Sequence, residues 1–136
     1  MRYLLDTNIL SDLIRNPLGG AAHRLRVVGN ESVATSIIVS AELRYGVAKK
    51  GSLTLSRRVE ATLDTIEILS FEHPADVVYA GLRAELERRG QIIGANDLLI
   101  AAQSIALGMV LVTDNTQEFR RIKSLTVENW LTRNLS

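Results

Sequence analysis

Short apolar runs alternate with longer segments of helical period along the whole chain, and this order restricts the possible folds more than any other feature. Buried strands are predicted at residues 3–5, 32–34, 66–69 and 109–113, with a weaker one at 125–127. Helices are predicted at residues 8–15, 20–28, 36–49, 53–65, 74–89 and 96–107. Strands that alternate with helices form parallel crossover units. The sequence therefore predicts a three-layer α/β/α fold with a mainly parallel sheet of four or five strands.

The ends of the helices and the length of the chain fit one domain. Glycines stand where four of the predicted helices should end, at positions 29, 51, 90 and 108. A chain of 136 residues is long enough for a sizeable core but too short for two folding units. We expect a single domain over residues 1–136.

The scarcity of sulfur and imidazole ligands limits the chemistry of any site. The chain has no cysteine, which excludes a disulfide framework, a thiolate zinc site and a cysteine nucleophile. It has only two histidines, His23 and His73. A bound metal would therefore need mainly oxygen ligands, which favours Mg²⁺ or Mn²⁺ over zinc.

Hydropathy and charge give expectations about location and partners. The most apolar window, from Leu98 to Val112, is shorter than the roughly 20 residues that cross a bilayer. The first eight residues lack the apolar middle of a signal peptide. We expect a cytoplasmic protein with no membrane association. The net charge is +1, so binding to nucleic acid would depend on local basic patches.

Two acidic residues directly follow predicted strands. Asp6 comes after the strand at residues 3–5, and Asp114 comes after the strand at residues 109–113. In open parallel sheets, ligands bind outside the carboxyl ends of the strands. Both acids are expected in that region, although each could instead serve only as the cap of the next helix.

Two further acids fall on helices where a solvated carboxylate is unexpected. Glu42 lies mid-helix on the stripe of Ile38, Val39 and Tyr45. Asp97 opens the helix at residues 96–107, whose following turns present small or apolar side chains. The stripe favours a functional role for Glu42, whereas Asp97 is equally typical of an ordinary first helical turn.

If the four acids converge, their mutual repulsion raises some of their pKa values unless cations neutralise the charge. One or two Mg²⁺ or Mn²⁺ ions would do so, and would activate water for hydrolysis at a phosphate. Neighbouring polar side chains that could complete the outer shell are Thr7, Asn8, Thr113 and Asn115.

Four motifs in a fixed order carry a resemblance to a known family. They are Leu4-Leu5-Asp6-Thr7-Asn8, Ser40-Ala41-Glu42-Leu43-Arg44-Tyr45-Gly46, Ile93-Gly94-Ala95-Asn96-Asp97-Leu98-Leu99-Ile100-Ala101-Ala102 and Leu111-Val112-Thr113-Asp114-Asn115-Thr116-Gln117-Glu118-Phe119. In this order and spacing the chain resembles the PIN-domain ribonucleases, and within them the VapC-type toxins of toxin-antitoxin pairs. The resemblance covers nearly the whole chain.

The resemblance implies an α/β/α endoribonuclease that depends on a divalent metal and is inhibited by a cognate antitoxin. It maps the first three family acids onto Asp6, Glu42 and Asp97. Asp6 and Asp97 would hold the principal Mg²⁺, and Glu42 would ligate or orient the attacking water. The fourth acid is assigned to Asp114, with Asn115 and Glu118 as alternatives. The resemblance also implies a homodimer and a higher assembly with the antitoxin.

An RNA substrate, such as a structured or looped RNA or a tRNA, needs cationic contacts around the acidic centre. Arg44 is the best candidate, because it lies two residues from Glu42. Two other functions compete with a nuclease. A haloacid-dehalogenase-like phosphatase needs a second acid where this chain has Asn8, and a non-catalytic binding module would not need all four acidic positions.

Overall fold

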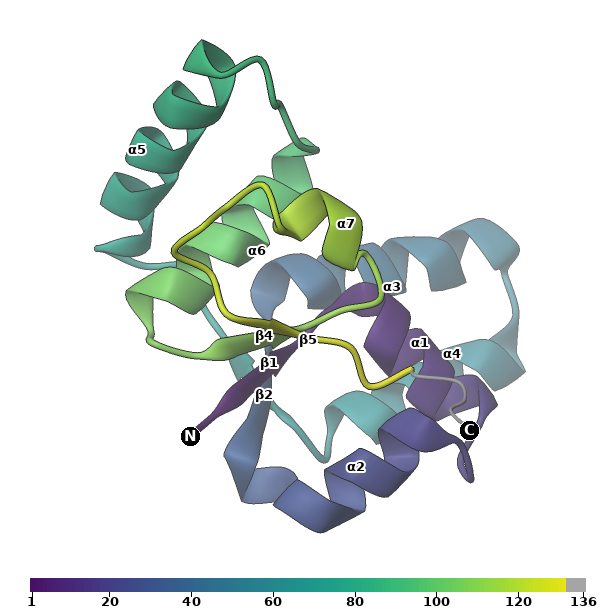
Figure 1. Ribbon diagram of the computed structural model, residues 1–136. Helices are drawn as coiled ribbons and strands as arrows, with labels where there is room; N and C mark the ends of the chain where they lie inside the picture. Colours follow the sequence, from purple (N-terminus) through teal and green to yellow (C-terminus); the bar gives the residue numbers. More distant parts are fainter. Residues whose placement is uncertain (132–136) are drawn as a thin grey trace.

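A five-stranded sheet forms the centre of the computed structural model, which describes residues 1–131 (Figure 1). All neighbouring strands pair in parallel, in the order β3-β2-β1-β4-β5. The strands are β1 (Tyr3–Leu5), β2 (Val33–Ser36), β3 (Glu67–Leu69), β4 (Val110–Val112) and β5 (Val127–Glu128). β1 is therefore the central strand, although it is the first in the chain. The predicted α/β class and parallel sheet are confirmed.

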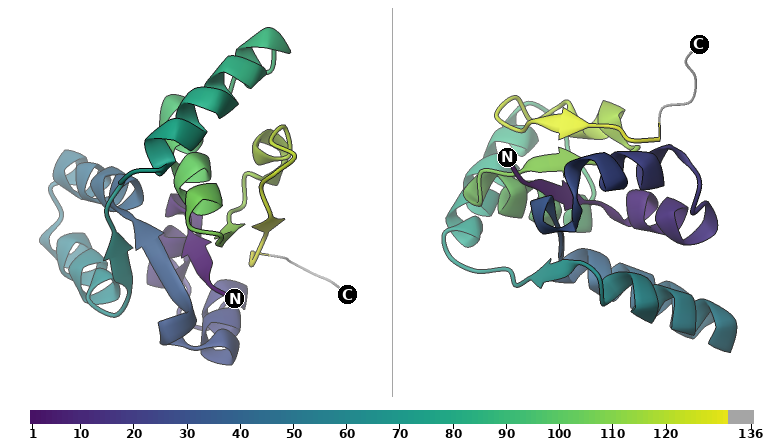
Figure 2. Two further views of the ribbon diagram at one scale, coloured as in Figure 1. Left: turned by 90° about the vertical axis from the view of Figure 1, so that its left-hand side faces the viewer. Right: turned by 90° about the horizontal axis from the view of Figure 1, so that it is seen from below.

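In the described part of the chain, seven α-helices connect the strands. They are α1 (Thr7–Arg15), α2 (Gly20–Val28), α3 (Ile37–Lys50), α4 (Leu53–Leu63), α5 (Ala75–Arg88), α6 (Ala95–Ala106) and α7 (Thr116–Phe119). Crossovers between parallel strands are right-handed, so α1 to α4 cover one face of the sheet and α5 to α7 the other. Figure 2 shows α4 and α6 on opposite sides of the sheet. The three predicted layers are confirmed.

The core lies where helices cover both faces of the central strands. Leu4 and Leu5 in β1, and Leu111 and Val112 in β4, have no exposed surface. Strands buried on both faces are continuously apolar rather than alternating. For this reason the short apolar runs of the sequence located the strands correctly.

Several boundaries differ from the prediction. β2 extends to Ser36, and β5 begins at Val127 rather than residue 125. The four-residue helix α7 and a 3₁₀ turn at Asn30–Ser32 were not predicted, because one turn is too short to give a periodic pattern. The four glycines lie at or just beyond helix ends with positive φ, as predicted; Gly90 has φ = 66°, a conformation that side chains disfavour.

The order in which strands are added to the sheet reverses at β1: β2 and β3 lie on one side of it, and β4 and β5 lie on the other. The segment after β1 turns into α1 on one face, and the segment after β4 turns into α7 on the other. Such a switch point leaves a crevice at the carboxyl ends of the two strands. Asp6 and Thr113 directly follow these strands.

Within residues 1–131, no helix is long and apolar enough to cross a membrane. Residues 132–136 of the predicted domain lie outside the described part.

Candidate active site

Asp6 lies between β1 and α1 and is almost completely buried, with 3% of its surface exposed. Its Oδ1 accepts a hydrogen bond from the backbone N–H of Thr7 (2.8 Å), which caps α1. Its Oδ2 accepts one from the hydroxyl of Thr113 (2.8 Å). Burial raises the pKa of Asp6 above its ordinary 3.8; these hydrogen bonds oppose that rise, and the charge of Glu42 adds to it.

Glu42 approaches Asp6 from the middle of α3. Its Oε1 accepts a short hydrogen bond from the hydroxyl of Thr7, and its Oε2 accepts one from the side-chain amide of Asn96 (3.2 Å). Both carboxylate oxygens are thus oriented by donors from α1 and α6. The expected stripe is only partly confirmed: Val39 is buried, whereas Tyr45 is 66% exposed because nothing in residues 1–131 covers that face of α3.

Asp97 joins the group from the first turn of α6. Its pKa is raised to about 7, chiefly by burial, then by its hydrogen bond with Glu118 and by the negative charges of Asp6, Glu118 and Glu42. The structure therefore brings Asp6, Glu42 and Asp97 together electrostatically, as expected from the topology.

The fourth nearby carboxylate is Glu118 of α7. It shares a hydrogen bond with Asp97 and accepts others from the backbone N–H of Gly94 and from Asn115 Nδ2 (2.8 Å). These hydrogen bonds, led by the one with Asp97, lower the pKa of Glu118.

The side chain of Asp114, the residue assigned as the fourth acid, is directed to another part of the structure. Its Oδ1 accepts a hydrogen bond from the amide of Asn129 (2.9 Å), on the exposed side of the segment after β4. The physical reason is the alternation of side chains along an extended segment. Thr113 is fully buried and faces Asp6, so the next side chain points away.

The four residues expected to support the site all contact it or each other. Thr7 binds Glu42 and Thr113 binds Asp6, as described above. Asn8 accepts a hydrogen bond from the backbone N–H of Asp114 (2.9 Å), and its amide lies 3.4 Å from the hydroxyl of Thr113. Asn115 donates to Glu118, and its amide lies 3.4 Å from Asp97 Oδ2. The sequence reasoning missed Asn96, whose position next to Asp97 was the available signal.

Arg44, the expected RNA contact, forms an ion pair with Glu60 of α4 (2.9 Å) on the exposed surface. The structure therefore places it beside α4 and not in the carboxylate group. Basic side chains at the end of α5 are also paired, because Arg88 and Arg89 both contact Glu85.

The side chains fit a hard divalent cation in their chemistry, but they are not gathered into a preformed site. None of the ion pairs within residues 1–131 involves the carboxylate group of Asp6, Glu42, Asp97 and Glu118. Their oxygen atoms suit Mg²⁺ or Mn²⁺ as ligands. In the same described part, no three His, Cys, Asp or Glu side chains are close enough to hold an ion. Binding would thus draw the carboxylates inward and neutralise their repulsion.

A parallel α/β domain with an acidic group at its switch point belongs to the open α/β proteins, which bind ligands at the carboxyl ends of their strands. The model of the PIN domain family matches residues 3–125. The chain belongs to the PIN domain family.

Two curated relatives cover almost the whole chain. The "Ribonuclease VapC2" of Rickettsia felis is 42% identical over 132 residues, covering 96% of this chain and 98% of the relative. The "tRNA(fMet)-specific endonuclease VapC" of Salmonella typhimurium is 32% identical, with coverage of 96% and 98%.

A solved structure of VapBC2 from Rickettsia felis, bound to a DNA fragment from its promoter, contains a chain with the same fold. The TM-score is 0.88 at 40% identity, and the match covers 96% of this chain and 99% of the other. The resemblance to VapC-type PIN proteins that the four motifs indicated is confirmed.

Proposed function

We propose that this protein is the toxin of a toxin-antitoxin pair and acts as a metal-dependent endoribonuclease. The observation that carries the proposal is the convergence of Asp6, Glu42 and Asp97 in a chain whose ribonuclease relatives match it over 96% of its length. Hydrolysis of an RNA phosphodiester bond needs a positioned water and a counter-charge for the phosphate, and this group of side chains suits both needs.

Asp6 and Asp97 are the proposed ligands of a Mg²⁺ ion, with Mn²⁺ as an alternative. A bound divalent ion activates water and neutralises the charge that develops on the phosphate. Glu42 orients the attacking water and accepts its proton, because Thr7 and Asn96 hold its two oxygens in place. Glu118 takes the fourth position, because it contacts Asp97 whereas Asp114 is bonded to Asn129.

Structured or looped RNA is the proposed substrate, with tRNA as the first candidate. This choice is supported by the relatives named as tRNA(fMet)-specific endonucleases. We propose that the protein acts in the cytoplasm, where such RNA is found. The cognate antitoxin is the proposed partner, since similar solved structures are of VapBC, a family of toxin-antitoxin systems. Pairing of two copies into a homodimer is part of the same proposal.

The decisive experiment is RNA cleavage by the purified protein with Mg²⁺, with Mn²⁺ and with a chelator. Cleavage is expected only with a divalent ion, and Asp97→Ala is expected to abolish it while the circular dichroism spectrum stays unchanged. Cleavage that persists in the chelator would overturn the metal-dependent mechanism. A chain that binds RNA but never cuts it would be a non-catalytic binding module.

Growth of cells that express the protein separates a toxin from a housekeeping nuclease. Expression is expected to arrest growth, and co-expression of the small protein encoded beside it is expected to restore growth. The haloacid-dehalogenase-like alternative is tested with a phosphate monoester. No release of phosphate is expected, because Asn8 stands where that chemistry needs an acid and its amide is bonded within the site.

A further inference from the structure

Two arginines outside the carboxylate group connect α7 to the segment between α5 and α6. Arg121 donates from Nη1 to the carbonyl of Ile92 (2.7 Å). Arg89, at the end of α5, donates from Nη2 to the carbonyl of Arg121 (2.9 Å). Each segment thus supplies one guanidinium and one carbonyl to the other, although 29 and 32 residues separate the bonded partners. We call this pair of hydrogen bonds the arginine clasp.

The clasp residues are close in sequence to the contact that holds Glu118. Gly94, two residues after Ile92, donates its backbone N–H to the carboxylate of Glu118. Arg121 lies three residues after Glu118, and its own N–H donates to the carbonyl of Glu118 (3.2 Å). The guanidinium of Arg121 therefore spans from the end of α7 to the segment that carries the Glu118 contact. Loosening the clasp frees both sides of that contact at once.

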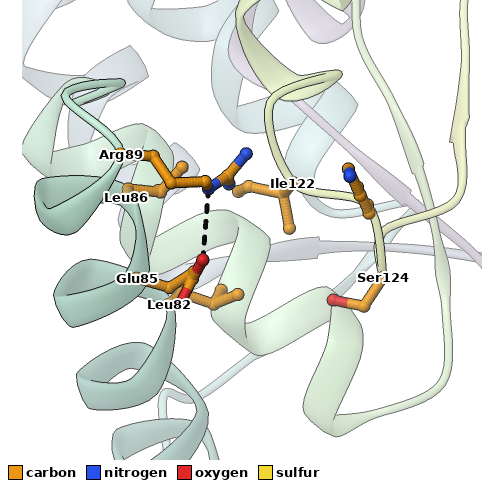
Figure 3. A pocket seen from close by; sticks show the side chains of 7 residues that line it. Leu82, Glu85, Leu86, Arg89, Ile122 and Ser124 are labelled. Carbon is orange, nitrogen blue, oxygen red and sulfur yellow. Dashed lines mark ion pairs between the residues drawn. The ribbon is translucent and has the colours of Figure 1, made fainter.

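Contacts at the end of α5 fix the guanidinium of Arg89, which is one half of the arginine clasp. Its Nε pairs with Glu85 (3.3 Å) and its Nη1 donates to Gln91 (3.0 Å), so the guanidinium is fixed from its own side. Figure 3 shows Arg89 reaching from α5 toward Ile122, across one end of a cavity of about 260 Å³. Apart from the clasp, α7 is a helix of four residues with no side-chain cap. Its position thus depends on contacts made beyond its own turn.

We propose that Arg121, supported by Arg89, is a positioning residue that holds Glu118 beside Asp97 and thereby sets the cation affinity of the site. This inference rests on the proposed function, because it assigns Glu118 to the cation site. Residues that orient metal ligands typically change affinity by about 10- to 100-fold when they are removed. The guanidinium of Arg121 binds the carbonyl of Ile92, and its charge also lowers the pKa of Glu118, so its action on the site passes through Glu118.

The direction of the expected effect separates this role from simple electrostatics. A carboxylate group attracts cations more strongly when a nearby positive charge is removed. Charge alone therefore predicts tighter cation binding in Arg121→Ala. The positioning role predicts weaker binding. Arg120→Ala is the matched control, because it removes the same charge from the adjacent residue, whose side chain makes no hydrogen bond or ion pair within the described residues.

The experiment is calorimetric titration of the metal-free protein with Mn²⁺ alone. Arg121→Ala is expected to weaken Mn²⁺ binding about tenfold, and Arg120→Ala to leave it unchanged or slightly tighter. In a Glu118→Gln background, Arg121→Ala is expected to cause no further loss, because both substitutions disable the same contact. Arg89→Ala is expected to weaken binding in the same direction by a smaller factor.

Each alternative gives a different result. Unchanged Mn²⁺ affinity in Arg121→Ala, with lower resistance to urea, would mean a merely structural role and would overturn the inference. Unchanged Mn²⁺ affinity with a raised KM for RNA would mean a phosphate contact and would also overturn it. Absence of Mn²⁺ binding by the unsubstituted protein would refute the proposed cation site itself, and the inference with it.

Discussion

Asp97→Asn is expected to stabilise the metal-free protein while it destroys cation binding. The folded chain raises the pKa of Asp97 from its ordinary 3.8 to about 7, so ionisation of this carboxyl at pH 8 opposes folding. At about 1.4 kcal/mol for each pH unit, the upper limit is about 4 kcal/mol. Asp97 is only half-buried and solvent screens its charge, so the expected gain is about 1 to 2 kcal/mol.

The pH dependence has a definite sign. Because the pKa is higher in the folded chain, the stabilising contribution of Asp97 is complete below pH 3.8 and is lost as the pH rises to about 7. The advantage of Asp97→Asn over the unsubstituted protein should therefore be less than half as large at pH 5 as at pH 8. For a chain of 136 residues, a gain of about 1 to 2 kcal/mol corresponds to a rise in Tm of about 3 to 7 °C.

The assay is urea unfolding followed by circular dichroism, in a chelator, at pH 5 and pH 8. Asp114→Asn is the matched control, because this carboxylate is exposed and bonded to Asn129 outside the group. An Asp97→Asn variant that is less stable than the unsubstituted protein at pH 8 would refute the reasoning. An equal gain in Asp114→Asn would refute it as well, since the effect would then reflect net charge.

The remaining predictions concern the cation, the buried carboxylate and the fourth acid. Mn²⁺ at 100 times its Kd should raise the free energy of unfolding by about 2.7 kcal/mol, measured by urea unfolding, and Asp97→Asn should lose this response. Thr113→Val should cost about 1 to 3 kcal/mol in the same assay, because it leaves Oδ2 of the buried Asp6 without its donor. Glu118→Ala should lower kcat for RNA cleavage about 100-fold, whereas Asp114→Ala should change it only a few-fold.

The controls for these experiments come from the same chain. Thr126 is exposed, so Thr126→Val should leave stability nearly unchanged and shows whether loss of any threonine hydroxyl has the same cost. A Mn²⁺ response that survives in Asp97→Asn would exclude Asp97 as a ligand. A larger loss of kcat in Asp114→Ala than in Glu118→Ala would restore Asp114 to the fourth position.

The sequence located three acids because each occupies a recognisable place in the fold. Asp6 directly follows an apolar strand, Asp97 opens a helix after a glycine, and Glu42 lies on a helix next to the buried Val39. Parallel topology then brings strand ends to one edge of the sheet. These rules concern the order of strands and helices along the chain, which the hydrophobic pattern largely determines.

The fourth acid could not be assigned in the same way. Its choice depends on which of two successive side chains after β4 turns inward, and Thr113 takes that direction because its hydroxyl binds Asp6. The choice of the fourth acid also depends on α7, a single turn that is too short to give a periodic pattern in the sequence. Contacts between short segments far apart in the chain, such as that of Glu118 with Gly94, cannot be predicted from a local sequence pattern.

The carboxylate group is divided between the two ends of the chain, and this division has a consequence during synthesis. Asp6 and Glu42 are translated first, whereas Asp97, Glu118 and the strand β4 that flanks β1 come from the last third of the chain. A nascent chain that has emerged only as far as residue 90 holds half of the acids and lacks the strand beside which they assemble. With the proposed site, RNA cleavage is therefore expected only when the polypeptide is nearly complete, so that the ribosome meets no active nuclease during synthesis.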